Sequence, residues 1–244
     1  MADHTYTNAH RLFVQSLLSH QILNEDKALE IYEKVCTLAN AQPTDFALFV
    51  GEINHRINEY DMALRRGHDQ QSGQEVIAFV NTKPDDLAQL ATRYDANQIT
   101  FLRRLIEMIV MADDEAFSVR SLAAIQLGQR MEPTMTSRAT EEFLDQLVAD
   151  RWLVVTSSGV YGFGTRALLE LAGYLRDQFP DAIKECLMCT DLVTIGERCD
   201  LQPCAVRIHL HCAEQLFVNN QRPLVCPECS TSWSRSNTIG LPQS

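Results

Sequence analysis

Eight side chains within residues 186–229 follow a zinc-binding pattern, and they include seven of the chain's eight cysteines. In chain order they are Cys186, Cys189, Cys199, Cys204, His209, Cys212, Cys226 and Cys229. Each Cys-x2-Cys pair lets one tight turn present two thiolates to one metal, so eight ligands divide into two four-coordinate sites. A catalytic zinc keeps one position open for water, whereas these ligands leave none. We therefore expect two zinc ions with a structural role and no catalytic residue in this segment.

The order of the ligands is typical of two folds, a RING-like cross-brace and a PHD finger. In both, the first, second, fifth and sixth ligands hold one metal, and the other four hold the second. The order predicts site one as Cys186, Cys189, His209 and Cys212, and site two as Cys199, Cys204, Cys226 and Cys229. His209 is the predicted ligand in preference to His211, because His-x2-Cys forms a chelating turn.

The aromatic content of the segment favours the RING-like alternative. A PHD finger that reads methyl-lysine needs an aromatic cage and usually a Trp two residues before the seventh ligand. That position holds Leu224, and the aromatic residues from Cys186 onward are Phe217 and Trp233. The pattern therefore argues against a histone reader.

A RING that recruits a ubiquitin-conjugating enzyme uses a shallow apolar groove beside its two metal loops. An apolar residue inside the first Cys pair and a Pro inside the last pair contribute to it. Leu187, Met188 and Pro227 occupy these places and are the predicted conjugating-enzyme surface. Leu216 and Phe217 either complete that surface or pack the small core, and we favour packing.

Composition describes an ordinary globular chain of 244 residues, with 45% apolar and 22% charged side chains. The formal net charge of −11 disfavours a large nucleic-acid footprint, which needs a basic face. The first ten residues lack an apolar signal core, and no stretch approaches the length of a membrane helix, so we expect a soluble protein without membrane contact. In a reducing compartment the cysteine pattern indicates metal ligation rather than disulfides. Cys36 stands apart and is expected to be a buried small hydrophobe.

Helical periodicity predicts helices over 9–19, 28–35 and 43–57, with start signals at Asn24, Pro43 and Asp45. The following segments, 62–66 and 74–81, are predicted to form a hairpin around the Gly67–Gly73 turn. Three helices and a hairpin are the pattern of a winged-helix domain.

The pattern then repeats over 97–164, with a cap at Asn97, a helix opening at Ser118, a third helix over 136–150 and a hairpin turning at residues 157–159. A last helix is predicted over 165–179, ending before Pro180. The predicted fold class is α+β, with winged-helix domains at 1–95 and 96–180, a cross-brace zinc-binding RING-like domain at 181–233 and a frayed tail at 234–244.

The third helix of each helical domain is acidic. The first carries three acidic residues, Asp45, Glu52 and Glu59, against one arginine, Arg56. The second carries four carboxylates against one arginine, Arg138. Such helices repel phosphate, so we expect protein partners, with DNA contact at most secondary. The pairs Arg65-Arg66 and Arg103-Arg104 are interpreted as solvated surface charge.

Several stretches resemble the RING-bearing non-SMC element subunit of the SMC five/six genome-maintenance complex, the non-structural maintenance of chromosomes element 1 family. They are CLMCTDLVTIGERC, CAVRIHLHC, LFVNN and CPECSTSW in the zinc segment, with HRLFVQSLLSHQILNEDKALEIY, the RRG turn and RALLELAGYLRDQFPDAIKEC before it. The specific marks are Arg-x-His-x2-Cys at Arg207 to Cys212, and Trp233 four residues after the last ligand. The match covers nearly the whole chain.

The resemblance implies tandem winged helices that pair with a MAGE-type subunit, a kleisin subunit that completes the subcomplex, and a RING that supports ubiquitin ligation. It also implies a nuclear, chromosome-associated protein of DNA repair and recombination. Two departures are visible: four residues separate Cys199 from Cys204, and Ser230 stands where strong ligases carry a basic side chain. We predict a RING-type E3 ubiquitin ligase subunit with two zinc ions; the alternative is a non-catalytic scaffold subunit of the same complex.

Overall fold

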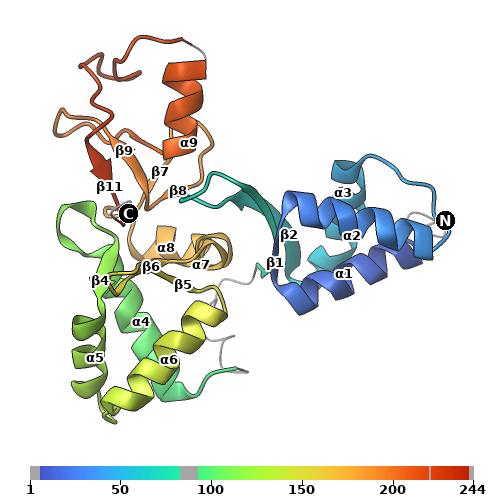
Figure 1. Cartoon of the computed structure of the whole chain (residues 1–244), viewed down its shortest axis with the longest axis horizontal. Helices are drawn as coiled ribbons and strands as arrows, with labels where there is room; N and C mark the ends of the chain where they lie inside the picture. The colour runs from blue at the N-terminus through green and yellow to red at the C-terminus, as the bar shows by residue number, and fades with distance from the viewer. Residues whose placement is uncertain (1–5, 83–92, 220, 242–244) are drawn as a thin grey trace. The chain divides into compact units, whose positions relative to one another are not determined.

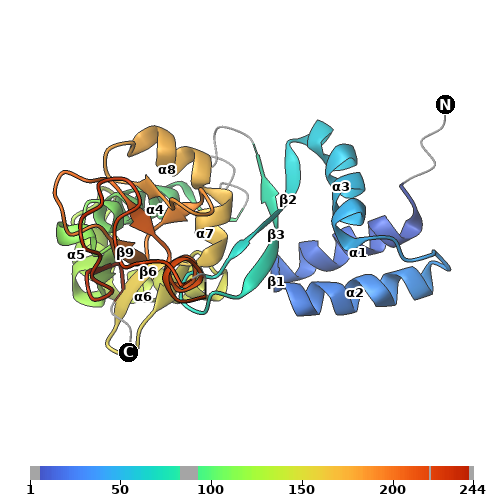
Figure 2. The same cartoon turned by 90° about the horizontal axis from the view of Figure 1, so that it is seen from above.

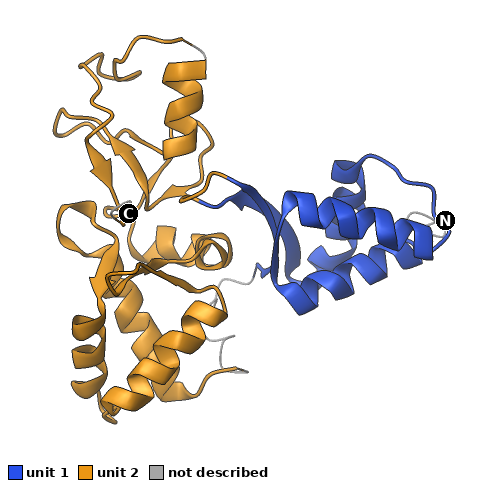
Figure 3. Ribbon diagram, viewed as in Figure 1, with its two compact units in different colours: residues 1–69, 74–86 blue, residues 70–73, 87–244 orange. Residues whose placement is uncertain are grey.

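The computed structural model describes residues 6–82, 93–219 and 221–241. The chain divides into two compact units (Figure 3), residues 1–69 with 74–86 and residues 70–73 with 87–244. Within the described ranges, no helix combines the length and the apolar character that crossing a membrane requires.

The first unit contains helices α1 (Asn8–His20), α2 (Glu25–Leu38) and α3 (Phe46–Ile57). Two of them begin at the predicted signals: the Asn24 side chain accepts a hydrogen bond from the Lys27 amide, and the Asp45 carboxylate accepts from the amides of Ala47 and Leu48. These caps satisfy amides that have no partner inside the helix. Helices α1 and α2 run side by side (Figures 1 and 2).

The predicted hairpin of the first unit is present, and its first strand runs two residues further than predicted. Strands β2 (Met62–His68) and β3 (Glu75–Asn81) pair antiparallel, with Leu64 opposite Phe79. A short strand that the sequence analysis missed, β1 (Ile22–Asn24), adds to β3 and gives the order β1-β3-β2. Apolar side chains of the three helices and of Leu64 and Ile77 form one core.

The second unit begins with α4 (Ala96–Val110), β4 (Ser118–Arg120), α5 (Ser121–Gln129), α6 (Ser137–Ala149), β5 (Leu153–Val155) and β6 (Val160–Phe163). The strands pair in the order β4-β6-β5. In both units, helices and a three-stranded sheet follow the order that a winged helix requires, and that assignment stays a prediction.

Three predictions in this part of the chain are wrong. The cap of α4 is Asp95, not Asn97, because the Asp95 carboxylate and the Gln98 side chain satisfy each other's amides. Ser118 opens strand β4, and α5 starts only at Ser121. The last predicted helix breaks at Leu171 into α7 (Thr165–Glu170) and α8 (Ala172–Gln178), where Gly173 lowers the helix propensity.

The described residues between 184 and 239 add short strands and a short helix to the second unit. They are β7 (Lys184–Glu185), β8 (Leu192–Val193), β9 (Gly196–Arg198), β10 (Arg207–Ile208), β11 (Thr238–Ile239) and α9 (Leu210–Ala213), with a π-helix at Glu214–Asn219. One continuous apolar cluster extends from α4 through Leu168 and Ile183 to Trp233 and Ile239. The predicted segments 96–180 and 181–233 therefore share a core.

The tail also differs from its prediction of fraying over 234–244, as far as it is described. Residues 238–239 form β11, which pairs with β9. Ile239 and Leu241 are buried, and Leu241 packs so closely on Gly162 that a Cβ there would meet its Cδ1 at 2.6 Å. The two buried apolar side chains of this tail, Ile239 and Leu241, explain why the segment is ordered.

Candidate metal centres

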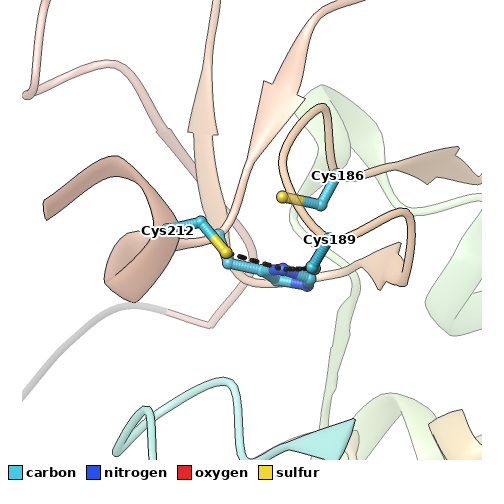
Figure 4. A group of neighbouring side chains, drawn as sticks. Cys186, Cys189 and Cys212 are labelled. Atoms are coloured by element: carbon cyan, nitrogen blue, oxygen red, sulfur yellow. Dashed lines mark hydrogen bonds between the residues drawn. The ribbon is translucent and has the colours of Figure 1, made fainter. Parts of the chain in front are cut away.

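Site one brings together Cys186, Cys189, His209 and Cys212. Their ligand atoms all lie within 4.8 Å of one another. Cys186 follows β7, His209 immediately precedes α9, and Cys212 lies inside that helix. Figure 4 shows Cys186, Cys189 and Cys212 grouped together, with the sulfur atoms of Cys186 and Cys212 turned toward the space between them.

Site two brings together Cys199, Cys204, Cys226 and Cys229, again with all ligand atoms within 4.8 Å. The Sγ atoms of Cys199 and Cys229 are 3.5 Å apart, and those of Cys204 and Cys226 are 3.8 Å apart. The two groups are the interleaved sets that the ligand order predicts. The long spacing before Cys204 does not keep that residue from the group.

The two Cys-x2-Cys turns have the same local geometry. In the first, the Cys186 amide donates to the Asp191 carbonyl at 2.8 Å, and the Thr190 amide donates to the Cys186 carbonyl at 2.9 Å. In the second, the Cys226 amide donates to the Thr231 carbonyl at 2.7 Å, and the Ser230 amide donates to the Cys226 carbonyl at 2.9 Å. Such a turn holds two thiols on one side, where both reach one ion.

His209 is oriented by its second ring nitrogen. Nε2 lies 3.0 Å from the Leu192 carbonyl oxygen, so Nε2 carries the proton and donates it. Nδ1 then keeps its lone pair, 3.3 Å from the Cys189 Sγ. A hydrogen bond of this kind fixes the tautomer of a metal-binding imidazole. His211 stacks on His209 at 5.1 Å between ring centroids and lies outside the four-donor group.

The donor sets fit zinc. With metal–sulfur bonds of about 2.3 Å, a tetrahedral site has sulfur–sulfur edges of about 3.8 Å. The two thiol contacts in site two, at 3.5 and 3.8 Å, are close to that edge. Thiolate and imidazole donors are also the ligands that zinc takes in closed structural sites.

The thiols influence one another's ionisation. Contacts with Cys189 and Cys212 hold the pKa of Cys186 far below the usual thiol value, whereas contact with Cys186 raises the pKa of Cys212. In site two, hydrogen bonding to Thr231 lowers the pKa of the Cys229 thiol to about 6. Repulsion between neighbouring thiolates prevents all of them from ionising at once. A bound divalent cation would offset this repulsion and stabilise the thiolates together.

The predicted conjugating-enzyme residues are exposed. Leu187 and Met188 retain 38% and 40% of their accessible surface inside the first cysteine turn, and Pro227 is exposed inside the second. Leu216 and Phe217 are buried, and the Phe217 ring packs on Trp233 at 5.6 Å. Those two side chains therefore pack the core of the module, as we favoured.

Sequence reasoning assigned no role to a buried carboxylate beside the metal groups. Glu197 is 1% exposed and accepts hydrogen bonds from Trp233 Nε1 at 2.7 Å and from Arg235 Nε at 2.6 Å. Trp233 and Arg207 were singled out only as marks of the family resemblance. Nothing in the nearby sequence identifies Glu197 as the partner of Trp233 or Glu115 as the partner of Arg207, because more than thirty residues separate the members of each pair.

The fold and the two four-donor groups define the class: a mixed helix and strand protein with a RING-like metal module. A RING-like domain model matches residues 186–229, the segment with all eight donors. A second model, described as Nse1 non-SMC component of SMC5-6 complex, matches residues 10–171, more than half of the chain. The chain belongs to this Nse1 family, which confirms the resemblance that the motifs indicated.

Relatives of known identity agree. The non-structural maintenance of chromosomes element 1 homolog of Homo sapiens is 29% identical over 230 residues, covering 93% of this chain and 84% of the relative. The Schizosaccharomyces pombe element 1 is 31% identical over 191 residues, 78% of each chain. A chain of a solved Nse1-Nse3-Nse4 complex is similar with a TM-score of 0.81 and 26% identity, covering 93% of this chain and 97% of that chain.

Proposed function

We propose that this chain is a RING-type E3 ubiquitin ligase subunit of an SMC five/six chromosome-maintenance complex, held in shape by two structural zinc ions. The observation that supports it most is the pair of interleaved four-donor groups, which use all eight predicted ligands. Zinc bound there supplies folding energy, roughly 10–16 kcal/mol per ion in small zinc modules. With every donor supplied by the protein, no position is left for a reacting water.

The proposed activity is positioning. A RING has no nucleophile of its own, and it holds a charged ubiquitin-conjugating enzyme so that the thioester meets the attacking amine in a reactive geometry. Leu187, Met188 and Pro227 are the proposed contact surface, because they are exposed apolar side chains on the two cysteine turns.

The proposed partners follow from the family. The similar solved chain belongs to an Nse1-Nse3-Nse4 complex. We extend this to a MAGE-type subunit and a kleisin subunit bound to the helical domains of the present chain. The proposed location is the nucleus, on chromosomes.

One observation favours the alternative, a zinc-stabilised scaffold without ligase activity. Ser230, directly after the last cysteine, has a φ of 59° and takes part in the turn that shapes site two. A basic side chain near this position commonly bridges the conjugating enzyme and ubiquitin in strong ligases, and Ser230 has none to offer. A serine at position 230 also fits a ligase whose activity depends on its MAGE-type partner.

A reconstituted ubiquitination assay with the MAGE-type partner separates the two functions. We expect wild-type protein to form ubiquitin chains and Met188→Ala to lose most of this activity while keeping two zinc ions. The matched control is Leu122→Ala, which removes another exposed leucine-sized side chain, on α5. Absence of chains with any conjugating enzyme tested would favour the scaffold.

A further inference from the structure

An ion pair joins the second helical domain to the metal module inside the second unit. Glu115 ends a 3-10 turn, Asp113–Glu115, that follows α4. Its carboxylate accepts hydrogen bonds from Arg207 Nε at 2.6 Å and from Arg207 Nη2 at 2.5 Å. The Glu115 side chain is 26% exposed, and the Arg207 side chain is 11% exposed. A bidentate, half-buried arginine–carboxylate pair fixes both distance and orientation.

Arg207 in turn holds both metal loops. Its carbonyl oxygen accepts a hydrogen bond from the Leu187 amide at 3.0 Å, in the turn of site one. Its Nη1 donates to the carbonyl oxygen of Cys204 at 3.2 Å, in site two. The guanidinium and the main chain of one residue thus connect Glu115 with the loop that carries Leu187 and Met188.

The backbone around Glu115 is held in an unfavourable conformation. Asp114 and Glu115 both have a φ of 56°, in the left-handed region that residues with a Cβ rarely adopt. Contacts with the metal module compensate: Arg198 Nη2 lies 2.6 Å from the Asp114 carboxylate, and the Gly240 amide donates to the Glu115 carbonyl at 2.9 Å. Such backbone persists only where the surroundings determine it, and functional sites are where it is concentrated.

We propose that Glu115, acting through Arg207, is a positioning residue that orients the Leu187–Met188 loop relative to the second helical domain. This inference rests on the proposed ligase function, which makes that loop the conjugating-enzyme surface. Glu115 is not one of the eight metal donors, and it is not among the proposed conjugating-enzyme contacts. Its role is to set where the loop lies, and the metal ions set the fold of the module.

The test compares full-length wild-type protein with Glu115→Gln, which keeps the shape of the side chain and removes its charge. We expect Glu115→Gln to retain two zinc ions, while the Leu187 amide exchanges hydrogen roughly tenfold faster because a charge-assisted link is lost. In ubiquitination, the apparent KM for the charged conjugating enzyme should rise with kcat little changed. Arg207→Lys, which keeps the positive charge but cannot donate two parallel hydrogen bonds to the carboxylate, should show an intermediate effect.

The matched control is Glu142→Gln, which removes an exposed ion pair with Arg138 on α6 and should change nothing. Unchanged exchange at Leu187 in Glu115→Gln would overturn the proposal, whatever the ligase activity. If the wild-type protein forms no chains, the proposed function fails, while the exchange result still decides the positioning role. Should Glu115→Gln lose zinc, Glu115→Asp provides the measurement; zinc loss from both variants would make Glu115 a folding residue and sink the proposal.

Discussion

The hydrogen bonds of the buried His10 ring depend on its protonation state. The Thr7 amide donates to its Nδ1 at 2.9 Å, so Nδ1 is the acceptor and Nε2 donates to the Glu52 carboxylate, also at 2.9 Å. Tyr6 and Phe49 stack on the ring. Protonation of Nδ1 would remove the acceptor that completes the amino-terminal cap of α1.

The pKa of His10 predicts how the first unit responds to acid. Burial lowers this pKa from 6.5, although Glu52 opposes the shift. Between the lowered pKa of the folded state and the unfolded-state pKa of 6.5, the unfolded chain binds the proton more readily than the folded chain. The contribution of His10 to stability is therefore fully present above pH 6.5 and is lost as the pH falls through the lowered pKa. We expect hydrogen exchange in α1, corrected for intrinsic rate, to accelerate from about pH 7.5 to about pH 5.5.

The variant His10→Gln should abolish most of that pH dependence. His20→Gln, which changes an exposed histidine at the end of the same helix, is the control and should retain it. Protection of α1 that stays constant across this pH range would show that His10 does not control the stability of the helix.

At the scale of elements, β11 changes the boundary of the metal module. It pairs with β9, the central strand of the order β10-β9-β11. The residues after it also reach the helical domain, because Leu241 packs on Gly162 in β6. A strand of two residues is thereby stabilised mainly by burial of its neighbours rather than by its own propensity.

Removing the last buried leucine should therefore destabilise the second unit. Leu241→Ala deletes a side chain that is 4% exposed, and such truncations cost about 2 kcal/mol or more when the site cannot collapse. Denaturant unfolding of the zinc-loaded protein measures the change. The control Leu122→Ala alters a side chain that is 65% exposed, and its cost should stay within about 0.5 kcal/mol. Equal effects of the two variants would contradict the packing role of the tail.

At the scale of the whole molecule, the second unit has one core for two predicted domains. Apolar residues of α4 and α6 belong to the same cluster as Cys186, Cys212 and Trp233. We expect a module this small to depend on bound metal for its folding. Loss of metal should consequently reach the helices of the second unit and leave the first unit folded on its own core.

Removal of zinc with a strong chelator tests this coupling. We expect hydrogen exchange to accelerate in α4 and α6 together with the metal module, because the binding energy lost with each ion, about 10–16 kcal/mol, is as large as the usual stability of a whole domain. Exchange in α1 to α3 should not change, and returning zinc should restore protection. Full protection of α4 after chelation would mean that the helical domain folds independently of the module.

The sequence by itself determined the features that depend on nearby residues. Cysteine pairs with two residues between them define chelating turns, His-x2-Cys selects His209 over His211, and Asn24 and Asp45 cap the helices that follow them. The tertiary structure decided what depends on distant residues: the pairing of Glu115 with Arg207, the ordering of Leu241 against Gly162, and the single core of the second unit. The physical reason is range, since a chelate or a cap involves a few consecutive residues, whereas burial and ion pairing across the fold depend on which distant surfaces meet.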